Sequence, residues 1–240
     1  LHVAAKTVGF PSVLKATRMG YDGRGQRFVG DETQLAQAWQ SLDTDTAILE
    51  SRIEFDREVS MIAVRSSEGA HQFYPLTENQ HQDGILHISR APTDTGSAEQ
   101  QARRHLAAIM AELDYVGILT VEFFQTQDQL IANEMAPRVH NSGHWTIEGA
   151  ATSQFENHLR AICGMPLGST DPLGFAAMVN LLGSIPPQHQ LLAEDQLHMH
   201  DYGKSPRPNR KVGHCTLVDR DSKQLNARLE RLLQHLGSGT

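Results

Sequence analysis

GILTVEFFQTQDQLIANEMA, residues 117–136, contains two apolar runs separated by a polar Thr-Gln-Asp turn. Short runs of this composition on either side of a turn predict a β-hairpin with arms at 117–125 and 129–136. Each arm carries one glutamate, Glu122 or Glu134, among apolar neighbours that we expect to be buried. A buried carboxylate is costly unless it is paired or bound to a metal ion, and two that face each other across a hairpin repel. We therefore predict a cation between them.

Mg²⁺ is the cation that suits this pair, because it takes carboxylate oxygens together with the phosphates of a substrate. The amide oxygen of Asn141, shortly after the hairpin, can complete the set of ligands. The alternative is that one or both glutamates pair with Arg138 or another base.

The loop that follows the hairpin, PRVHNSGHW (137–145), concentrates basic and polar side chains around a proline and a glycine. His140 and His144 have the spacing of a helical zinc site, but Pro, Gly and Asn disfavour a helix and no H-E-x-x-H motif surrounds them. We interpret the loop as one that binds an anion or a substrate.

An apolar run at 10–16, FPSVLKA, predicts a strand that ends near Lys15, and Gly20, Gly23 and Gly25 follow it. Glycines let backbone N–H groups approach a polyphosphate, and a nearby lysine supplies a point charge. The spacing matches neither the Walker A motif nor the Rossmann motif. A flexible hairpin tip with one surface lysine is therefore the alternative.

Glu50 and Glu58 lie at the ends of two predicted strands, 47–51 and 57–66. At a strand end, a carboxylate or backbone group can bind the amine of adenine, and a second carboxylate can accept from both ribose hydroxyls. The alternative is a pair of surface glutamates.

Two more polar segments interrupt the apolar pattern. His81, Gln82 and Asp83 read as a tight turn within a sheet. Arg210 and Lys211 would bind a phosphate if they faced a cleft, and otherwise form a solvated surface. Helices predicted at 31–42, 97–113, 153–163 and 222–236 alternate with strands, which indicates an α+β protein with much antiparallel sheet.

Composition narrows the class of protein. The chain has 240 residues and a formal net charge of −7, a poor match to nucleic acid or an anionic membrane. No apolar run approaches the roughly 18–20 residues of a membrane span, and no signal peptide is visible. Cys163 and Cys215 are too few for a disulfide framework, so we expect a cytoplasmic protein. The chain begins with Leu and with what looks like the end of a helix, so we expect a piece of a longer protein.

In order and spacing, these segments resemble the N5-carboxyaminoimidazole ribonucleotide synthases, a family of ATP-grasp ligases. Other ATP-grasp enzymes share the lysine, the glutamate pair and the two metal carboxylates, but not HQDGI or RVHNSGHWT. The segments that carry the resemblance are Lys15 with GYDGRGQ (20–26), Glu50 with Glu58, FYPLTENQHQDGI (73–85), NEMAPRVHNSGHWT (133–146) and RKVGH (210–214).

The resemblance implies an ATP-grasp fold, in which two α+β subdomains hold ATP, followed by a small β-rich C-terminal domain. It places the small lid subdomain at 1–46, the large subdomain with the metal and substrate site at 47–165, and the C-terminal domain at 166–240. Members of the family carry a further N-terminal domain.

The resemblance also assigns residues. For ATP they are Lys15, Gly20, Tyr21, Asp22, Gly23, Arg24, Gly25, Gln26, Glu50, Ser51, Arg52, Ile53, Glu58, His81, Asn133 and Glu134. For the aminoimidazole ribonucleotide they are Asp22, Arg24, Arg138, His140 and Lys211, of which Asp22, Arg138 and His140 are the implied catalytic residues. For Mg²⁺, with Mn²⁺ as a substitute, they are Glu122, Glu134 and Asn141.

The implied activity is an ATP-dependent carboxylation in purine biosynthesis. ATP phosphorylates bicarbonate to carboxyphosphate, and the amine of 5-aminoimidazole ribonucleotide captures the carboxyl group, with His140 and Asp22 able to manage the amine proton. The implied partners are these small molecules, a second copy of the full-length chain, and the mutase that takes the product. The alternatives are another ATP-grasp carboxylase or ribonucleotide ligase, or an inactive nucleotide-binding fragment.

Overall fold

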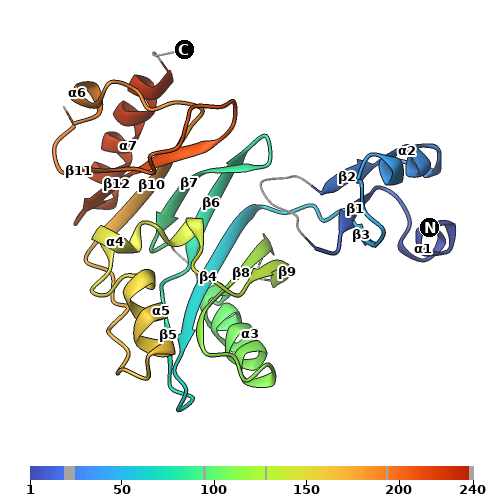
Figure 1. Ribbon diagram of the computed structural model, residues 1–240, viewed down its shortest axis with the longest axis horizontal. Coiled ribbons are helices and arrows are strands. Elements are labelled where there is room, and N and C mark those ends of the chain that lie inside the picture. Colours follow the sequence, from blue (N-terminus) through green and yellow to red (C-terminus); the bar gives the residue numbers. More distant parts are fainter. Residues whose placement is uncertain (19–24, 94–95, 128, 193, 238–240) are drawn as a thin grey trace. The chain divides into compact units, whose positions relative to one another are not determined.

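The computed structural model describes residues 1–18, 25–93, 96–127, 129–192 and 194–237 (Figure 1). The chain divides into two compact units. Unit 1 comprises Leu1–Glu54 with Gln82–Ile85, and unit 2 comprises Phe55–His81 with Leu86–Thr240. Within the described ranges, none of the helices combines the length and the apolar character that a membrane crossing requires.

Unit 1 is a small antiparallel sheet covered by short helices. Strand β1 alternates, so that Leu14 points into the core while Lys15 does not. Helix α1 and helix α2 complete a core around Leu14, Leu35 and Leu49. The elements are α1 (His2–Val8), β1 (Ser12–Ala16), β2 (Gln26–Val29), η1 (Glu32–Gln34), α2 (Leu35–Gln40) and β3 (Ala47–Ser51), with strand order β2-β1-β3.

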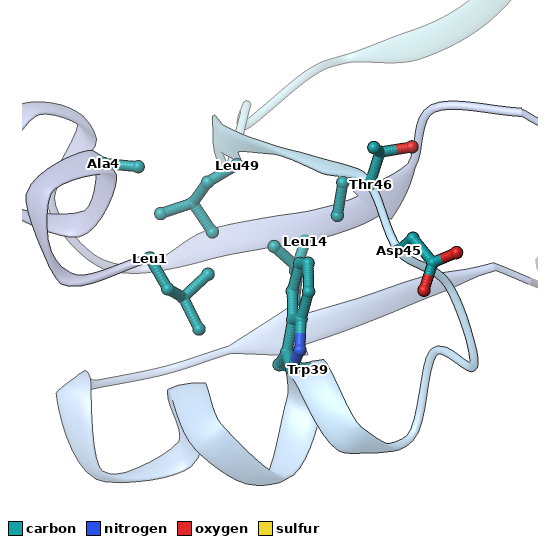
Figure 2. A pocket seen from close by; sticks show the side chains of 8 residues that line it. Leu1, Ala4, Leu14, Trp39, Asp45, Thr46 and Leu49 are labelled. Atoms are coloured by element: carbon teal, nitrogen blue, oxygen red, sulfur yellow. The ribbon is translucent and has the colours of Figure 1, made fainter.

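A pocket of about 510 Å³ opens beside this core (Figure 2). Apolar side chains form most of its wall, and Asp45 and Thr46 lie at one edge. The lining residues are Leu1, Ala4, Leu14, Trp39, Asp45, Thr46, Ala47 and Leu49.

Unit 2 is built on one large sheet whose strand order is β11-β12-β10-β7-β6-β4-β8-β9, with β5 paired to β4. The strands are β4 (Arg57–Arg65), β5 (His71–Phe73), β6 (Thr77–Gln82), β7 (Ile85–Ala91), β8 (Gly117–Thr126), β9 (Gln129–Ala136), β10 (Phe175–Leu182), β11 (Leu197–Asp201) and β12 (Lys211–Asp219). The helices are α3 (Ala98–Glu112), η2 (Asn141–Gly143), α4 (Thr146–Gly149), α5 (Gln154–Ile162), α6 (Gln188–Leu191) and α7 (Ser222–Gly237).

Helix α3 covers one face of the β4–β8–β9 part of the sheet (Figure 1). Its buried residues, Ala98, Ala102, Leu106 and Met110, recur every four positions and form one stripe. They pack against alternate strand residues, Val59, Met61 and Ala63 of β4 with Leu119, Val121 and Phe123 of β8. The period of two therefore turns Ile62 of β4 and Ile118 of β8 to the opposite face, which α5 covers.

The C-terminal strands extend the same sheet. Strand β10 pairs with β7, and helix α7 packs Leu225, Leu229 and Leu232 against the apolar side of β10 and β12. The strands of the predicted C-terminal domain, 166–240, thus join the sheet of the residues before them, and the boundaries between the two units fall at 54/55, 81/82 and 85/86. The three-part division remains a prediction.

The helical segment predicted over 31–42 is present as the 3₁₀ turn η1 followed by α2, and the carboxylate of Asp31 caps it by accepting the backbone N–H of Thr33 at 2.8 Å. The predicted turn at 81–83 was wrong in part. His81 lies in strand β6, whereas we expected it in a turn. The turn is instead Asp83–Gly84, whose φ angles of 51° and 76° suit a two-residue hairpin connection.

Tyr74 tests the packing of unit 2, because its ring is fully buried and its hydroxyl joins two segments. The hydroxyl donates to the carbonyl of Thr152 and accepts from the side chain of Asn157, both at 2.9 Å. We expect Tyr74→Phe to lower the free energy of unfolding by about 1–3 kcal/mol, because two buried polar groups each lose a hydrogen bond. Denaturant unfolding followed by Trp145 fluorescence in a Trp39→Phe background measures the change.

The matched control is Tyr115→Phe, which removes one hydrogen bond from a half-buried hydroxyl to the carbonyl of Ile118. Tyr115→Phe should lower the free energy of unfolding by less than Tyr74→Phe does. Equal losses would show that the burial of the Tyr74 hydroxyl has no special role.

Candidate functional site

One face of the sheet in unit 2 carries a band of polar side chains. On β4, Glu58 and Ser60 share the face of Ile62, opposite α3. The strand register places Ser60 beside Glu122 of β8 and Glu58 beside Asn79 of β6. Neighbouring strands add Thr77, Ser89, Asn180 and His214 to the same face.

Glu122 and Glu134 stand directly opposite each other across β8 and β9, as the predicted hairpin requires, but Glu134 is exposed, contrary to our expectation that both would be buried. The register shifts between Glu122 and Phe123, because Asn133 is an extra residue on β9. Such a bulge redirects side chains locally. The acidic pair therefore lies at the irregular part of the hairpin.

His140 joins this pair from the loop after the hairpin. Its Nε2 lies 3.0 Å from Oε1 of Glu122, and one potential ligand atom from each of Glu122, Glu134 and His140 lies within 4.8 Å of the other two. The side chain of Gln154 clamps the backbone of His140, since it accepts the N–H at 2.9 Å and donates to the carbonyl at 2.6 Å. Gln154 thus holds the backbone of His140, while Glu122 contacts its ring.

The loop reaches this position because Gly143 has no side chain. A Cβ at Gly143 would lie 2.2 Å from Cδ1 of Ile62 and 2.9 Å from the amide of Gln154. Only glycine lets the 3₁₀ turn η2 sit this close to strand β4.

The acidic pair fits a divalent cation. The side chain of Glu122 is 15% exposed. Burial alone would raise its pKa, but the hydrogen bond from His140 and the positive charges of His81 and Lys211 outweigh burial and lower it. An ionised, largely buried carboxylate beside a second carboxylate is the donor set that Mg²⁺ takes. Glu122 and Glu134 are therefore the residues that would hold it.

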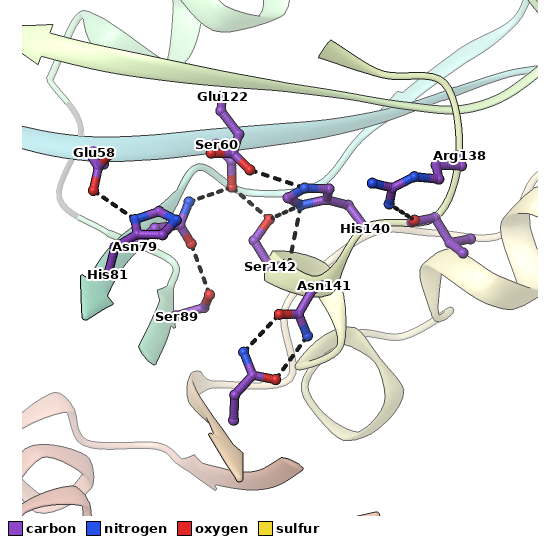
Figure 3. Close-up of polar contacts among 12 residues, drawn as sticks. Glu58, Ser60, Asn79, His81, Ser89, Glu122, Arg138, His140, Asn141 and Ser142 are labelled. Atoms are coloured by element: carbon purple, nitrogen blue, oxygen red, sulfur yellow. Dashed lines mark hydrogen bonds and ion pairs between the residues drawn. The ribbon is translucent and has the colours of Figure 1, made fainter. Parts of the chain in front are cut away.

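Asn141, the third predicted ligand, pairs its amide with that of Asn180 (Figure 3). Asn141 Nδ2 donates at 3.0 Å to Asn180 Oδ1, and Asn180 Nδ2 donates at 2.7 Å to Asn141 Oδ1. The amide oxygen of Asn141 keeps a second lone pair. Its role as a ligand remains a prediction.

His81 and Glu58 form a second acid–base pair on the same face. Nδ1 of His81 lies 2.7 Å from Oε2 of Glu58. Burial disfavours the charged imidazolium, but the hydrogen bond to Glu58 and the charges of Glu58 and Glu122 outweigh it, so the pKa of His81 is raised. The charge of Lys211, at the start of β12, acts on the pKa of His81 in the opposite sense.

Two neutral histidines and a tyrosine continue the band at its β12 end. The Tyr202 hydroxyl lies 2.9 Å from Nδ1 of His144 and 2.8 Å from Nδ1 of His214. Burial, followed by neighbouring positive charges, lowers the pKa of His144 to about 4 and that of His214 to about 3. These rings act as neutral hydrogen-bonding groups at neutral pH.

Unit 1 holds the other predicted nucleotide residues. Nζ of Lys15 lies 2.6 Å from Oε2 of Glu50, so β1 and β3 present a lysine–glutamate ion pair at one place. The guanidinium of Arg52 lies 5.3 Å from the ring centroid of Phe28. Gly25, Gln26, Ser51 and Ile53 lie at or next to the ends of β2 and β3.

Several predicted residues stay untested. Gly20, Tyr21, Asp22, Gly23 and Arg24 lie outside the described residues. Arg138 is exposed, and its guanidinium donates to the carbonyl of Val139 at 3.0 Å. The roles given above to the residues in both units remain predictions.

The polar residues around His140 and Asn141 were not predicted from the sequence. A single polar residue in the apolar run of β4, Ser60, was a signal that could have been used. Asn79 was hidden in a segment taken as the approach to a turn. The missed residues are the buried Ser60, Asn79, Ser89, Ser142 and Asn180 and the half-buried Tyr202.

The raised pKa of His81 predicts a pH dependence of stability. A group whose pKa is higher in the folded state stabilises the protein fully below its unfolded value, near 6.5, and loses that contribution as pH rises through the folded pKa. His81→Gln should therefore lose more unfolding free energy below pH 6.5 than well above it. Denaturant titrations of both proteins at the two pH values measure the difference.

His198 provides the control, because it is an exposed residue of β11. His198→Gln should show no such pH-dependent difference. A difference for His81→Gln that grows as pH rises would contradict the ion pair with Glu58.

Comparison with known proteins places this geometry in a family. The sequence model of the ATP-grasp domain family matches residues 1–155. The sequence model of the phosphoribosylaminoimidazole carboxylase C-terminal domain family matches residues 176–228. The chain is 47% identical over 229 residues to the N5-carboxyaminoimidazole ribonucleotide synthase of Pseudomonas aeruginosa, covering 95% of this chain and 63% of that protein. It is 45% identical over 228 residues to the Escherichia coli protein of that name, covering 94% and 63%.

Solved structures agree. The crystal structure of N5-carboxyaminoimidazole ribonucleotide synthetase from Thermus thermophilus matches with a TM-score of 0.90 and 50% identity, over 97% of this chain and 64% of that chain. The Aspergillus clavatus synthase, in complex with ADP and 5-aminoimidazole ribonucleotide, matches with a TM-score of 0.89 and 27% identity, over 98% and 65%.

This chain thus spans less than two thirds of the length of the relatives that it matches. The ATP-grasp match covers both the strand pair that carries Lys15 and Glu50 and the hairpin that carries the acidic pair. The predicted fold is confirmed, and the chain belongs to the ATP-grasp family.

Proposed function

We propose that this protein, at its full natural length, carboxylates 5-aminoimidazole ribonucleotide with bicarbonate and ATP, giving N5-carboxyaminoimidazole ribonucleotide, ADP and phosphate. It would act as a C–N ligase of purine biosynthesis. The names and the identity of the relatives support the substrates. The observation that carries the proposal is the acidic pair Glu122 and Glu134 next to His140.

The proposed reaction has two steps. An oxygen of bicarbonate attacks the γ-phosphorus of ATP, which forms carboxyphosphate and breaks the bond to ADP. The exocyclic amine then attacks the carboxyl carbon, or CO₂ released from carboxyphosphate. A C–N bond forms, phosphate leaves, and the amine loses one proton. Such phosphoryl transfer needs positioning and charge neutralisation more than covalent groups.

The residues of this chain divide these tasks in the proposal. Lys15 would contact the ATP phosphates and Glu50 the adenine, while Glu58 and His81 would contact the ribose end. Glu122 and Glu134 would hold Mg²⁺, or Mn²⁺ in its place, which neutralises phosphate charge when bound. Lys211, whose charge already acts on Glu122 and His81, would bind the phosphate of the ribonucleotide.

The surroundings of the reaction are also part of the proposal. The enzyme would be cytoplasmic, would dimerise at full length, and would pass its product to a mutase that moves the carboxyl group. The formal net charge of the chain is −7, so its overall charge would repel phosphorylated substrates. Their attraction would have to come from local positive groups at the site.

Removal of either metal carboxylate tests the proposal. Glu122→Gln or Glu134→Gln should lower the rate of ADP release by more than about 100-fold, because a metal ion supplies several kcal/mol of charge stabilisation. The assay follows ADP with the full-length protein, with and without bicarbonate and the ribonucleotide. Glu112→Gln, on the helix that covers the opposite face, is the control and should keep its rate.

ADP release that ignores bicarbonate, or that requires a different acceptor, would rule out the proposed substrates. An unchanged rate in both glutamine variants would rule out the metal site.

A further inference from the structure

A line of four buried polar side chains leads from β7 to His140 (Figure 3). Ser89 Oγ donates to Asn79 Oδ1 at 2.8 Å, and Asn79 Nδ2 donates to Ser60 Oγ at 2.9 Å. Ser60 Oγ lies 2.8 Å from Ser142 Oγ. All four side chains are at most 4% exposed, so their protons must find partners within the line.

The direction of these hydrogen bonds follows from the far end of the line. The backbone N–H of Ser142 points at Nδ1 of His140 at 3.3 Å, so this ring nitrogen accepts. The Ser142 hydroxyl, 2.8 Å from the same nitrogen, therefore donates to it as well. Ser60 already accepts from Asn79 and must direct its own proton to Ser142. Each group in the line thus donates to the next.

A ring nitrogen that accepts carries no proton, so a neutral His140 carries its proton on Nε2. That nitrogen is the one 3.0 Å from Oε1 of Glu122, and it donates to the carboxylate. For His140 to act as a metal ligand through Nε2, the proton would have to move to Nδ1. There it would oppose the backbone N–H of Ser142, which cannot reverse its direction.

We propose that the line Ser89–Asn79–Ser60–Ser142 fixes the tautomer of His140, so that His140 orients Glu122 as a hydrogen-bond donor and does not ligate the cation. The four residues are positioning residues that act through His140. The inference deepens the proposed function and rests on it, because it assigns Glu122 and Glu134, but not His140, to the metal. Partners of this kind behind a ligand commonly set its orientation.

Nitrogen NMR of the metal-free protein tests the tautomer directly. Histidine labelled with ¹⁵N reports which ring nitrogen is protonated at neutral pH, and comparison with His140→Gln identifies the His140 signal among 13 histidines. The expected result is a protonated Nε2 and an unprotonated Nδ1. A proton on Nδ1 in the unmodified protein overturns the proposal, whatever the variants do.

Variants test the line itself. Ser142→Ala and Ser60→Ala should weaken the preference for the Nε2–H form, and should reduce Mn²⁺ affinity in the presence of ADP by roughly 10–100-fold. Ser169→Ala, an exposed serine that donates to Asp171, is the control and should change neither. A His140 spectrum and a Mn²⁺ affinity unchanged in both variants would show that the line has no positioning role.

Electron paramagnetic resonance of Mn²⁺ bound with ADP separates this inference from the proposed function. Direct coupling of Mn²⁺ to a histidine ¹⁵N, lost in His140→Gln, would overturn the inference and leave the metal site intact. If Mn²⁺ does not bind at all, the proposed metal site fails, while the NMR result still decides the tautomer.

Discussion

Two carboxylates held side by side are the constraint on which the rest of unit 2 depends. The register of β8 and β9 leaves Glu122 and Glu134 no other arrangement, since slipping β9 by one residue would turn its buried Leu130 away from the core under α3. The repulsion between them is therefore part of the fold. Hydrogen-bond donors and positive charges on the sheet face and in the covering loop offset this repulsion.

The neighbouring strands and the covering loop surround the two carboxylates with hydrogen-bond donors and positive groups. His140 donates to Glu122, and the charges of His81 and Lys211 lower the pKa of the same carboxyl. The loop can bring His140 there because Gln154 holds its backbone and Gly143 lets the turn approach β4. Most of the polar side chains on this face of the sheet are thus hydrogen-bonded or paired with an opposite charge.

The sequence predicted those parts of the site whose signal is local. The hairpin, its two glutamates and the helix of α3 follow from periodicity within about twenty residues. The line behind His140 does not, because Ser60 and Ser142 meet across 82 positions and each looks ordinary in its own segment. His81 was misplaced for a related reason, since a polar strand that faces a polar band lacks the alternation by which strands are recognised. The ATP-grasp assignment depended on motif resemblance, which carries long-range information that propensity does not.

The bulge in β9 has a consequence for how this hairpin tolerates change. Either side of Asn133, the pairs Glu122–Glu134 and Phe123–Ala132 follow each other as they would in an uninterrupted ladder. A strand one residue shorter at this point would close in the same register and would send the same side chains to the same faces. The pairing of β9 with β8 therefore does not use Asn133, so this position can be shaped by its other contacts and by the chemistry of the site.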